Sequence, residues 1–186
     1  MFVIKNEKNW VITKVNQNYI LRTGNKQFNC QVGAAGLKIH TKKREGDKTT
    51  PIGKWRLKSL YYRSNKGFRP IIKTKTFNIN RITKNCGWCD DPNSYSYNKY
   101  INIKNLSYKN INFEKLWRED QAYDIVIETS YNAKPIIKGK GSAIFIHCSF
   151  PDYRKTAGCI ALKKENLAIL VKNLSNKTYL EIKNCF

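Results

Sequence analysis

The sequence predicts a mostly β domain, of the sandwich or barrel type, with one or two short helices. Short runs rich in β-branched and aromatic residues recur along most of the chain, separated by Asn, Gly and Pro. Only one stretch, near the C-terminus, has apolar residues at clear helical spacing. A length of 186 residues fits one domain that buries its own core, so we expect residues 1–186 to form a single domain.

The first third of the chain predicts three strands and then a long loop. The strands are expected at residues 10–15, 19–22 and 27–32. In the third run, Phe28, Cys30 and Val32 alternate with polar residues, which is the period of a half-buried strand. Residues 33–53 are expected to form a loop, and loops of that length in compact domains are usually functional.

The middle of the chain predicts further strands around a polar segment. Strands are expected at residues 55–62, 77–82 and 122–129, a surface loop at 85–100 and a short helical turn at 113–117. The segment 85–100 is assigned to a loop because it is dense in Asp, Asn, Ser, Pro and Tyr and has no apolar periodicity.

The last third contains the stretch around which the rest is organised. An apolar run at residues 143–146 has the make-up of a buried strand and ends at His147. A polar loop follows, and Cys159 then begins another short apolar run. Leucine and valine side chains at helical spacing predict an amphipathic helix over residues 164–174, and a strand is expected at 179–182.

One loop therefore begins at His147 and ends at Cys159, and this pair suits nucleophilic catalysis. A free thiol has a pKa of about 8.5, and an adjacent imidazole can take its proton. Gly158 allows a sharp turn and lets a substrate carbonyl approach the backbone N–H groups around Cys159. Those N–H groups are the candidate oxyanion hole. His40, the other histidine, lies in a basic run and is expected to be a solvated loop residue.

These residues resemble the signature of the L,D-transpeptidase catalytic domain, also called the YkuD-type domain, in a divergent branch. The signature is a strand-terminal His followed by Ser/Thr-x-Gly-Cys, matched by His147 and by Thr-Ala-Gly-Cys at residues 156–159. Other blocks of the family are matched by residues 43–47 (Lys-Arg-Glu-Gly-Asp), 50–53 (Thr-Pro-Ile-Gly), 87–92 (Gly-Trp-Cys-Asp-Asp-Pro) and 141–147 (Gly-Ser-Ala-Ile-Phe-Ile-His). The similarity spans about residues 30–182.

The resemblance implies a single catalytic domain that transfers acyl groups between peptidoglycan stem peptides. Cys159 would form a thioester, His147 would be the general base, and Thr156 and Gly158 would complete the signature. An amine acceptor would make the enzyme a transpeptidase, and water would make it an L,D-carboxypeptidase. No metal or other cofactor is implied. The resemblance also implies a periplasmic or cell-wall location.

Two positions differ from the common form of the signature. Ala157 stands where a second His is usual, and Ala161 stands where an Arg is usual. Another cation must then hold the substrate carboxylates, and Arg suits this better than Lys because its planar fork makes two hydrogen bonds. The candidates near the matching blocks are Arg44, Arg63, Arg118 and Arg154, with Trp88 as a wall of the cleft.

The charge leaves other functions to weigh. There are 35 Lys and Arg against 13 Asp and Glu, a formal net charge of +22. This balance favours anionic partners, but the basic residues are scattered through a chain rich in Lys, Asn and Ile, so nucleic-acid binding is not expected. Two alternatives stay open. One is a cysteine hydrolase of another peptide, and the other is a non-catalytic basic module that binds anionic cell-wall polymer.

The cysteines and the N-terminus bear on location. The six cysteines, Cys30, Cys86, Cys89, Cys148, Cys159 and Cys185, would suit disulfides in an exported protein. Residues 1–13 contain Lys5, Glu7 and Lys8 and lack the features of a signal peptide. No apolar run is long enough for a transmembrane helix. Cys86 and Cys89 form a Cys-x-x-Cys pair, but neither a redox motif nor a zinc site is expected, because no apolar helix and no second ligand pair accompany it.

Overall fold

The computed structural model describes residues 9–72, 77–105 and 110–183, and it confirms a mostly β fold with one α-helix. Within these residues the main sheet has ten strands. They are β1 (Trp10–Val15), β2 (Asn18–Thr23), β3 (Lys26–Cys30), β4 (Leu37–Ile39), β5 (Thr50–Tyr62), β6 (Asn78–Arg81), β10 (Ile125–Thr129), β11 (Phe145–Cys148), β12 (Ile160–Leu162) and β13 (Tyr179–Ile182). Most of the expected strands are present within a few residues of their expected bounds.

The main sheet is almost closed into a barrel. Its strands follow the order β12-β11-β10-β5-β13-β1-β2-β3, with β4 and β6 added beside β5. Just after β3, Gln31 pairs with Ala161 of β12 through two backbone hydrogen bonds of 2.8 and 2.9 Å. The two ends of the sheet therefore meet at a seam, which joins the N-terminal hairpin to the strand that follows Cys159.

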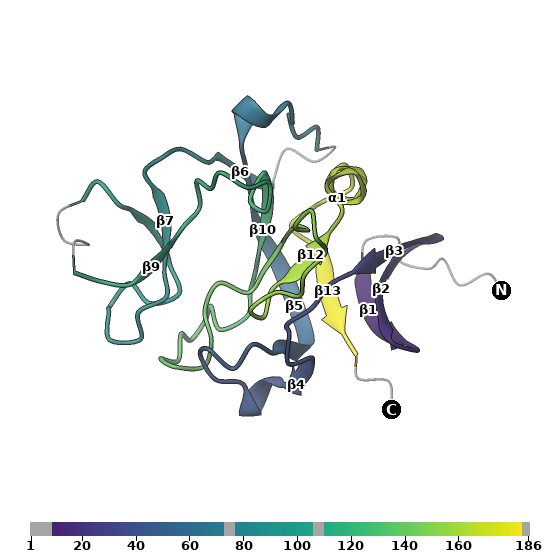
Figure 1. The fold of residues 1–186 in the computed structure, drawn as a ribbon, viewed down its shortest axis with the longest axis horizontal. Helices are drawn as coiled ribbons and strands as arrows, with labels where there is room; N and C mark the ends of the chain where they lie inside the picture. Colours follow the sequence, from purple (N-terminus) through teal and green to yellow (C-terminus); the bar gives the residue numbers. More distant parts are fainter. Residues whose placement is uncertain (1–8, 73–76, 106–109, 184–186) are drawn as a thin grey trace.

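A second sheet lies on the opposite side of the molecule from the N-terminal hairpin (Figure 1). It consists of β7 (Cys86–Cys89), β8 (Tyr100–Asn102) and β9 (Phe113–Lys115), in the order β8-β7-β9. All four residues of β7 are buried. The two sheets therefore share a second apolar cluster, distinct from the interior of the barrel.

Alternation along β10 and β11 separates the two clusters. Ile127 of β10 and Ile146 of β11 belong to the barrel core, whereas Val126 and Phe145 belong to the cluster beneath the small sheet. Because successive side chains of a strand point to opposite faces, His147 lies on the same face as Phe145. The barrel strand thus turns His147 toward the small sheet.

The helix α1 (Lys164–Val171) covers the barrel next to β10 and β11. Leu167, Leu170 and Val171 are its buried residues, as the helical spacing predicts. The helix ends three residues before the expected bound, but Leu174 is still buried in the same core. Two single-turn 3-10 helices, η1 (His40–Lys42) and η2 (Ser64–Lys66), complete the helical content of the described residues.

Three expectations about local structure are wrong. The segment 85–100 is not a loop throughout, because β7 lies within it and is buried on both faces, which removes the alternation that would have revealed a strand. Residues 113–117 do not form a helical turn, because Glu114 pairs with Trp88 of β7. The segment 33–53 contains β4, η1 and the start of β5, so it is only partly a loop. In each case a strand partner distant in sequence decides the local structure.

Within the described residues, no helix is both long enough and apolar enough to cross a membrane. The cysteines in this part of the chain are free, and Cys185 lies outside it. Cys86 and Cys89 lie on a strand, so this pair lacks the helix N-terminus that accompanies the Cys-x-x-Cys of redox motifs.

Candidate active site

The His147 ring is buried at the base of a cleft, and its tautomer follows from one contact. Its Nδ1 lies 2.8 Å from the carbonyl oxygen of Cys148, which can only accept a hydrogen bond. Nδ1 therefore carries the proton, and Nε2 of the neutral ring carries the lone pair. Burial lowers the pKa of His147 to about 4, so the ring is neutral near pH 7. The edges of Tyr123 and Phe150 enclose it, with ring centroids 5.3 and 6.1 Å away.

Cys159 immediately precedes β12, the strand that pairs with β11, on which His147 lies. The parallel pairing of β11 with β12 sets His147 opposite Ala161. Cys159 is two residues earlier, so its side chain points to the same face as the imidazole and both reach the small-sheet side. Both residues line the same cleft. This arrangement agrees with the expectation from the sequence that the loop brings the two side chains together.

The thiol of Cys159 is not hydrogen-bonded to the histidine. Its Sγ donates to the carbonyl oxygen of Ala143 at 2.9 Å and accepts from the N–H of Phe145 at 3.4 Å. Burial, with a further contribution from the charge of Glu114, raises the pKa of Cys159 to about 12. The resting site therefore holds a neutral thiol beside a neutral imidazole.

The turn before Cys159 requires glycine and two threonines. Gly158 has φ +142°, and a Cβ there would lie 3.0 Å from the carbonyl oxygen of Thr49. The Thr156 hydroxyl accepts from the Gly158 N–H at 3.1 Å and donates to the Cys159 carbonyl at 2.6 Å. Thr50 donates to the Gly158 carbonyl at 2.8 Å and accepts from the N–H of Gly33. Thr156 thus fixes the turn, and the N–H of Gly158 is engaged.

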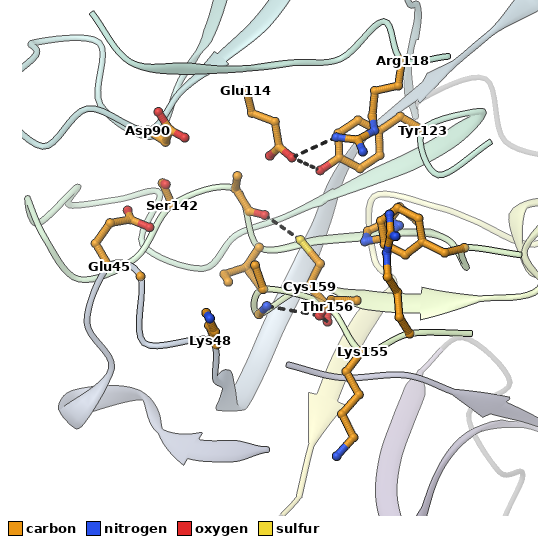
Figure 2. A pocket seen from close by; sticks show the side chains of 18 residues that line it. Glu45, Lys48, Asp90, Glu114, Arg118, Tyr123, Ser142, Lys155, Thr156 and Cys159 are labelled. Atoms are coloured by element: carbon orange, nitrogen blue, oxygen red, sulfur yellow. Dashed lines mark hydrogen bonds and ion pairs between the residues drawn. The ribbon is translucent and has the colours of Figure 1, made fainter. Parts of the chain in front are cut away.

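The cleft around the two side chains has a volume of about 570 Å³. Its charged lining residues are Glu45, Lys48, Asp90, Glu114, Arg118, Arg154 and Lys155. Glu45 and Asp90 lie together beside Ser142, while Arg118 and Lys155 lie beyond Cys159 on the other side (Figure 2). Lys48 lies on the same side of Cys159 as Glu45, so the acidic end of the cleft also has one cation, and the sulfur lies between this end and the basic end with Arg118.

Glu45 and Asp90 at the acidic end form no ion pair with another described residue. One oxygen of Asp90, Oδ1, is buried and has no hydrogen-bond partner among the described residues. Burial raises the pKa of Asp90, and the charges of Glu45 and Asp91 act in the same direction. Among the described residues, the Tyr97 hydroxyl is the hydrogen-bond partner of the Glu45 carboxylate and donates to it at 2.5 Å. A cation bound here would relieve this repulsion.

Glu114 connects the two ends of the cleft. It accepts a hydrogen bond of 2.5 Å from Tyr123 and lies 3.9 Å from Arg118 (Figure 2). Burial raises its pKa, although these two partners act to lower it. Arg118 itself is held by two hydrogen bonds of 3.0 and 2.7 Å from its guanidinium to Asp120. Tyr123 packs edge-on against His147, so this network reaches the imidazole.

The structure places two of the candidate arginines at the cleft and two elsewhere. Arg118 and Arg154 line it, with the Arg154 guanidinium 3.9 Å from the ring of Phe150. Arg44 is exposed on the 33–53 segment and bonds to backbone carbonyls there. Arg63 is buried against Trp117, and it donates to the backbone of Arg118 at 2.6 Å.

Trp88 does not line the cleft, but it supports the strand beside it. It is buried against Phe145, with ring centroids 4.9 Å apart. Its Nε1 donates to Asn98 at 3.0 Å, and the same Asn98 oxygen accepts from the N–H of Ala143. Ala143 has φ +49°, and its carbonyl is the acceptor of the Cys159 thiol. Trp88 therefore acts through Asn98 on the geometry of Ala143.

Other residues of the site had no assigned role in the sequence. Glu45, Thr50 and Asp90 lie inside blocks that resemble the family, so the blocks indicated the region but not the role. Glu114 and Tyr123 had no motif to mark them, because β9 was not expected and Tyr123 was assigned only to the expected strand at residues 122–129. His40 is exposed and lies against Trp55. No group of three or more metal-ligating side chains was found among the described residues.

The family model of the L,D-transpeptidase catalytic domain, YkuD, matches residues 8–182. No curated protein matches the chain. Among solved structures, a mutant of Pgp2, the helical cell shape determining protein of Campylobacter jejuni, is similar with 18% identity and a TM-score of 0.44. That match covers all of this chain and 49% of the other, so the chain spans about half the length of that protein.

Proposed function

The chain belongs to the L,D-transpeptidase catalytic domain family, and we propose that it catalyses cysteine-dependent acyl transfer on peptidoglycan stem peptides. The observation that carries the proposal is that His147, with an unprotonated Nε2, and Cys159 lie on the same sheet face and line the same cleft. An imidazole with this tautomer can accept a proton from the thiol without any other rearrangement of its own hydrogen bonds.

In the first transfer, the thiol leaves the Ala143 carbonyl and gives its proton to Nε2 of His147. The thiolate attacks the carbonyl carbon of a diamino-acid residue in the stem peptide. The backbone N–H of Cys159 is the candidate donor to the oxyanion, because the N–H of Gly158 is engaged by Thr156. His147 then returns the proton to the departing amine of the terminal D-amino acid, which leaves a thioester on Cys159.

In the second transfer, His147 again acts as a base. It takes a proton from an incoming amine or from water, and the nucleophile attacks the thioester carbonyl. The thiol is restored when Cys159 leaves with the proton from His147. An amine from a second stem gives a cross-link, and water gives L,D-carboxypeptidase activity with the same residues.

The two ends of the cleft suit the side chain of a diamino acid, which carries an amine and, in some forms, a carboxylate. The ammonium group would bind at Asp90 and Glu45, where the buried Asp90 oxygen lacks a partner. Substrate carboxylates would bind toward Arg118 and Arg154. This division places the carbonyl to be attacked between the two ends, close to Cys159.

The same proposal extends to the organisation and location of the protein. Residues 1–186 would work as one catalytic domain, and the partners would be peptidoglycan stem peptides. Because members of this family act on peptidoglycan, the proposed location is the periplasm or the cell wall.

A mass measurement on the intact protein tests the first transfer. A brief incubation with disaccharide-tetrapeptide should add the mass of the acyl group, and peptide mapping should place it on Cys159. The Cys159→Ser variant is the control, since an oxygen ester there would form far more slowly. An adduct on another cysteine, or none under conditions of turnover, would contradict the proposed thioester.

A further inference from the structure

A second hollow lies along the seam of the barrel and does not belong to the cleft. It has a volume of about 730 Å³. It is bounded by residues 27–31, which include most of β3, by β12 and by the start of α1. The seam is held by the pairing of Gln31 with Ala161, and beyond that pair the outer edge of β3 has no neighbouring strand among the described residues.

The lining of this seam groove is rich in amides and aromatic rings and poor in charge. The amides come from Asn18, Gln27, Asn29, Gln31 and Asn166. The rings come from Tyr19, Phe28 and Tyr153. Among the described residues that line the groove, Lys163 is the one charged residue, and none is a carboxylate. This composition contrasts with a chain of formal charge +22 and with the catalytic cleft.

The side-chain amides of the groove are available to a ligand. None of these five amide groups hydrogen-bonds another described residue through its side chain, and Asn18, Gln27 and Asn29 are exposed. Each amide offers two donors and an acceptor, which matches the hydroxyl and acetamido groups of a sugar. Aromatic rings beside them can pack on the C–H faces of sugar rings. An anionic polymer would need more cations than Lys163 supplies.

We propose that the seam groove binds a neutral N-acetylated saccharide, namely the glycan strand that carries the stem peptide. The choice of this saccharide rests on the proposed function, whereas the neutral, amide-rich chemistry of the groove does not. The glycan would be held on one side of the loop that joins β11 to β12, and its stem would enter the cleft on the other side.

The loop between the two hollows makes this arrangement possible. Ser149 and Tyr153 line the groove, while Phe150 and Arg154 line the cleft. Along β12, Ala161 lines the groove only two residues after Cys159, a separation of about 7 Å in an extended chain. The scissile carbonyl belongs to the third residue of the stem, and three extended residues span at most about 11 Å. The scissile carbonyl can therefore reach Cys159 from a sugar in the groove.

The test is an NMR titration of the Cys159→Ala protein with chitotetraose, a neutral tetrasaccharide of N-acetylglucosamine. We expect shifts for residues of β3 and the start of α1, and little change in affinity between 50 and 300 mM salt, because no charge pairs are involved. A double variant, Asn29→Ala with Asn166→Ala, removes amides from opposite walls and should weaken binding about tenfold or more. Gln17→Ala is the matched control, since Gln17 is an exposed amide on the same hairpin outside the groove.

Three results would overturn the inference: no shifts in the groove, binding that the double variant leaves intact, or binding that disappears at the higher salt concentration. The double variant with Cys159 in place should also raise KM for disaccharide-tetrapeptide and leave kcat and the turnover of free tetrapeptide unchanged. Failure of the proposed function is a different result: chitotetraose would still bind, but the wild-type protein would turn over neither substrate.

Discussion

The thiol of Cys159 donates a hydrogen bond of 2.9 Å to the main-chain carbonyl of Ala143, and not to the imidazole of His147. Ala143 has a left-handed backbone conformation, and its N–H is held by Asn98. The nucleophile is thus kept protonated by a carbonyl whose position is fixed by the small sheet. In the proposed mechanism, activation requires the thiol to turn from that carbonyl to Nε2 of His147.

This resting state predicts the reactivity of Cys159 toward iodoacetamide. Because burial raises the pKa of the thiol to about 12, alkylation of the free enzyme at pH 7 should be slow and should rise about tenfold per pH unit between pH 7 and 9. Glu114→Gln removes a charge that raises the pKa, so it should accelerate alkylation at each pH. Glu119→Gln, an exposed neighbour, should not. Peptide mapping after timed alkylation measures the rate, and a plateau above pH 7 would rule out this resting state.

Thr50 should be needed for the turn that presents Cys159. In Thr50→Val, the buried carbonyl of Gly158 and the N–H of Gly33 both lose their partner, at a cost of about 1–3 kcal/mol for each group. We expect the free energy of unfolding to fall by at least about 2 kcal/mol and activity to fall with it. Thr50→Ser keeps the hydroxyl and should stay close to wild type. Urea denaturation of the three proteins decides this, and equal loss in Ser and Val variants would argue against the hydrogen bonds.

His147 should make the fold sensitive to acid. Burial lowers its pKa from 6.5 to about 4, so between these values the unfolded chain binds a proton that the folded protein does not. Stability is therefore lost as the pH falls through this window, by about 3 kcal/mol in total. His147→Gln should remove that part of the pH dependence. Urea denaturation of the wild-type and His147→Gln proteins at pH 7 and pH 4.5 measures this contribution. If both proteins lose the same amount of stability between the two pH values, burial of the ring has no such effect.

The acidic end of the cleft should select a free amine on the substrate. Asp90→Asn keeps the size of the side chain but removes its charge, so kcat/KM for a stem with a free side-chain amine should fall about tenfold. For a stem whose amine is acetylated, kcat/KM of the same variant should fall less than about twofold, because that group is neutral. Glu165→Gln, which removes an exposed carboxylate on α1 away from the cleft, is the control. Equal losses on both substrates would place the ammonium elsewhere.

Much of the barrel could be predicted from the sequence because its strands carry their own patterns. The hairpin of β1 and β2 and the strand β13 have β-branched runs of the expected length, and α1 shows its helical spacing. The small sheet could not be predicted in this way. Its strand β7 is buried on both faces, and β9 has three residues and depends on pairing with β7.

For the site, the sequence placed His147 and Cys159 at the two ends of one loop, but it did not contain their hydrogen bonds. The contact of Cys159 with Ala143 and that of Thr50 with Gly158 join residues 16 and 108 positions apart, and neither has a local pattern. Arg118 and Arg154 were selected by proximity to motifs and reach the cleft. Arg44 was selected on the same basis and does not, because its side chain bonds to its own segment.

The most direct test of the central proposal is mass spectrometry of disaccharide-tetrapeptide muropeptides incubated with the protein and with its Cys159→Ala variant. The account predicts products only with the intact cysteine: cross-linked dimers if an amine is the acceptor, or tripeptides if water is. If the folded protein with a reduced thiol forms neither product, or if Cys159→Ala forms the same products, the proposed acyl transfer through Cys159 is contradicted.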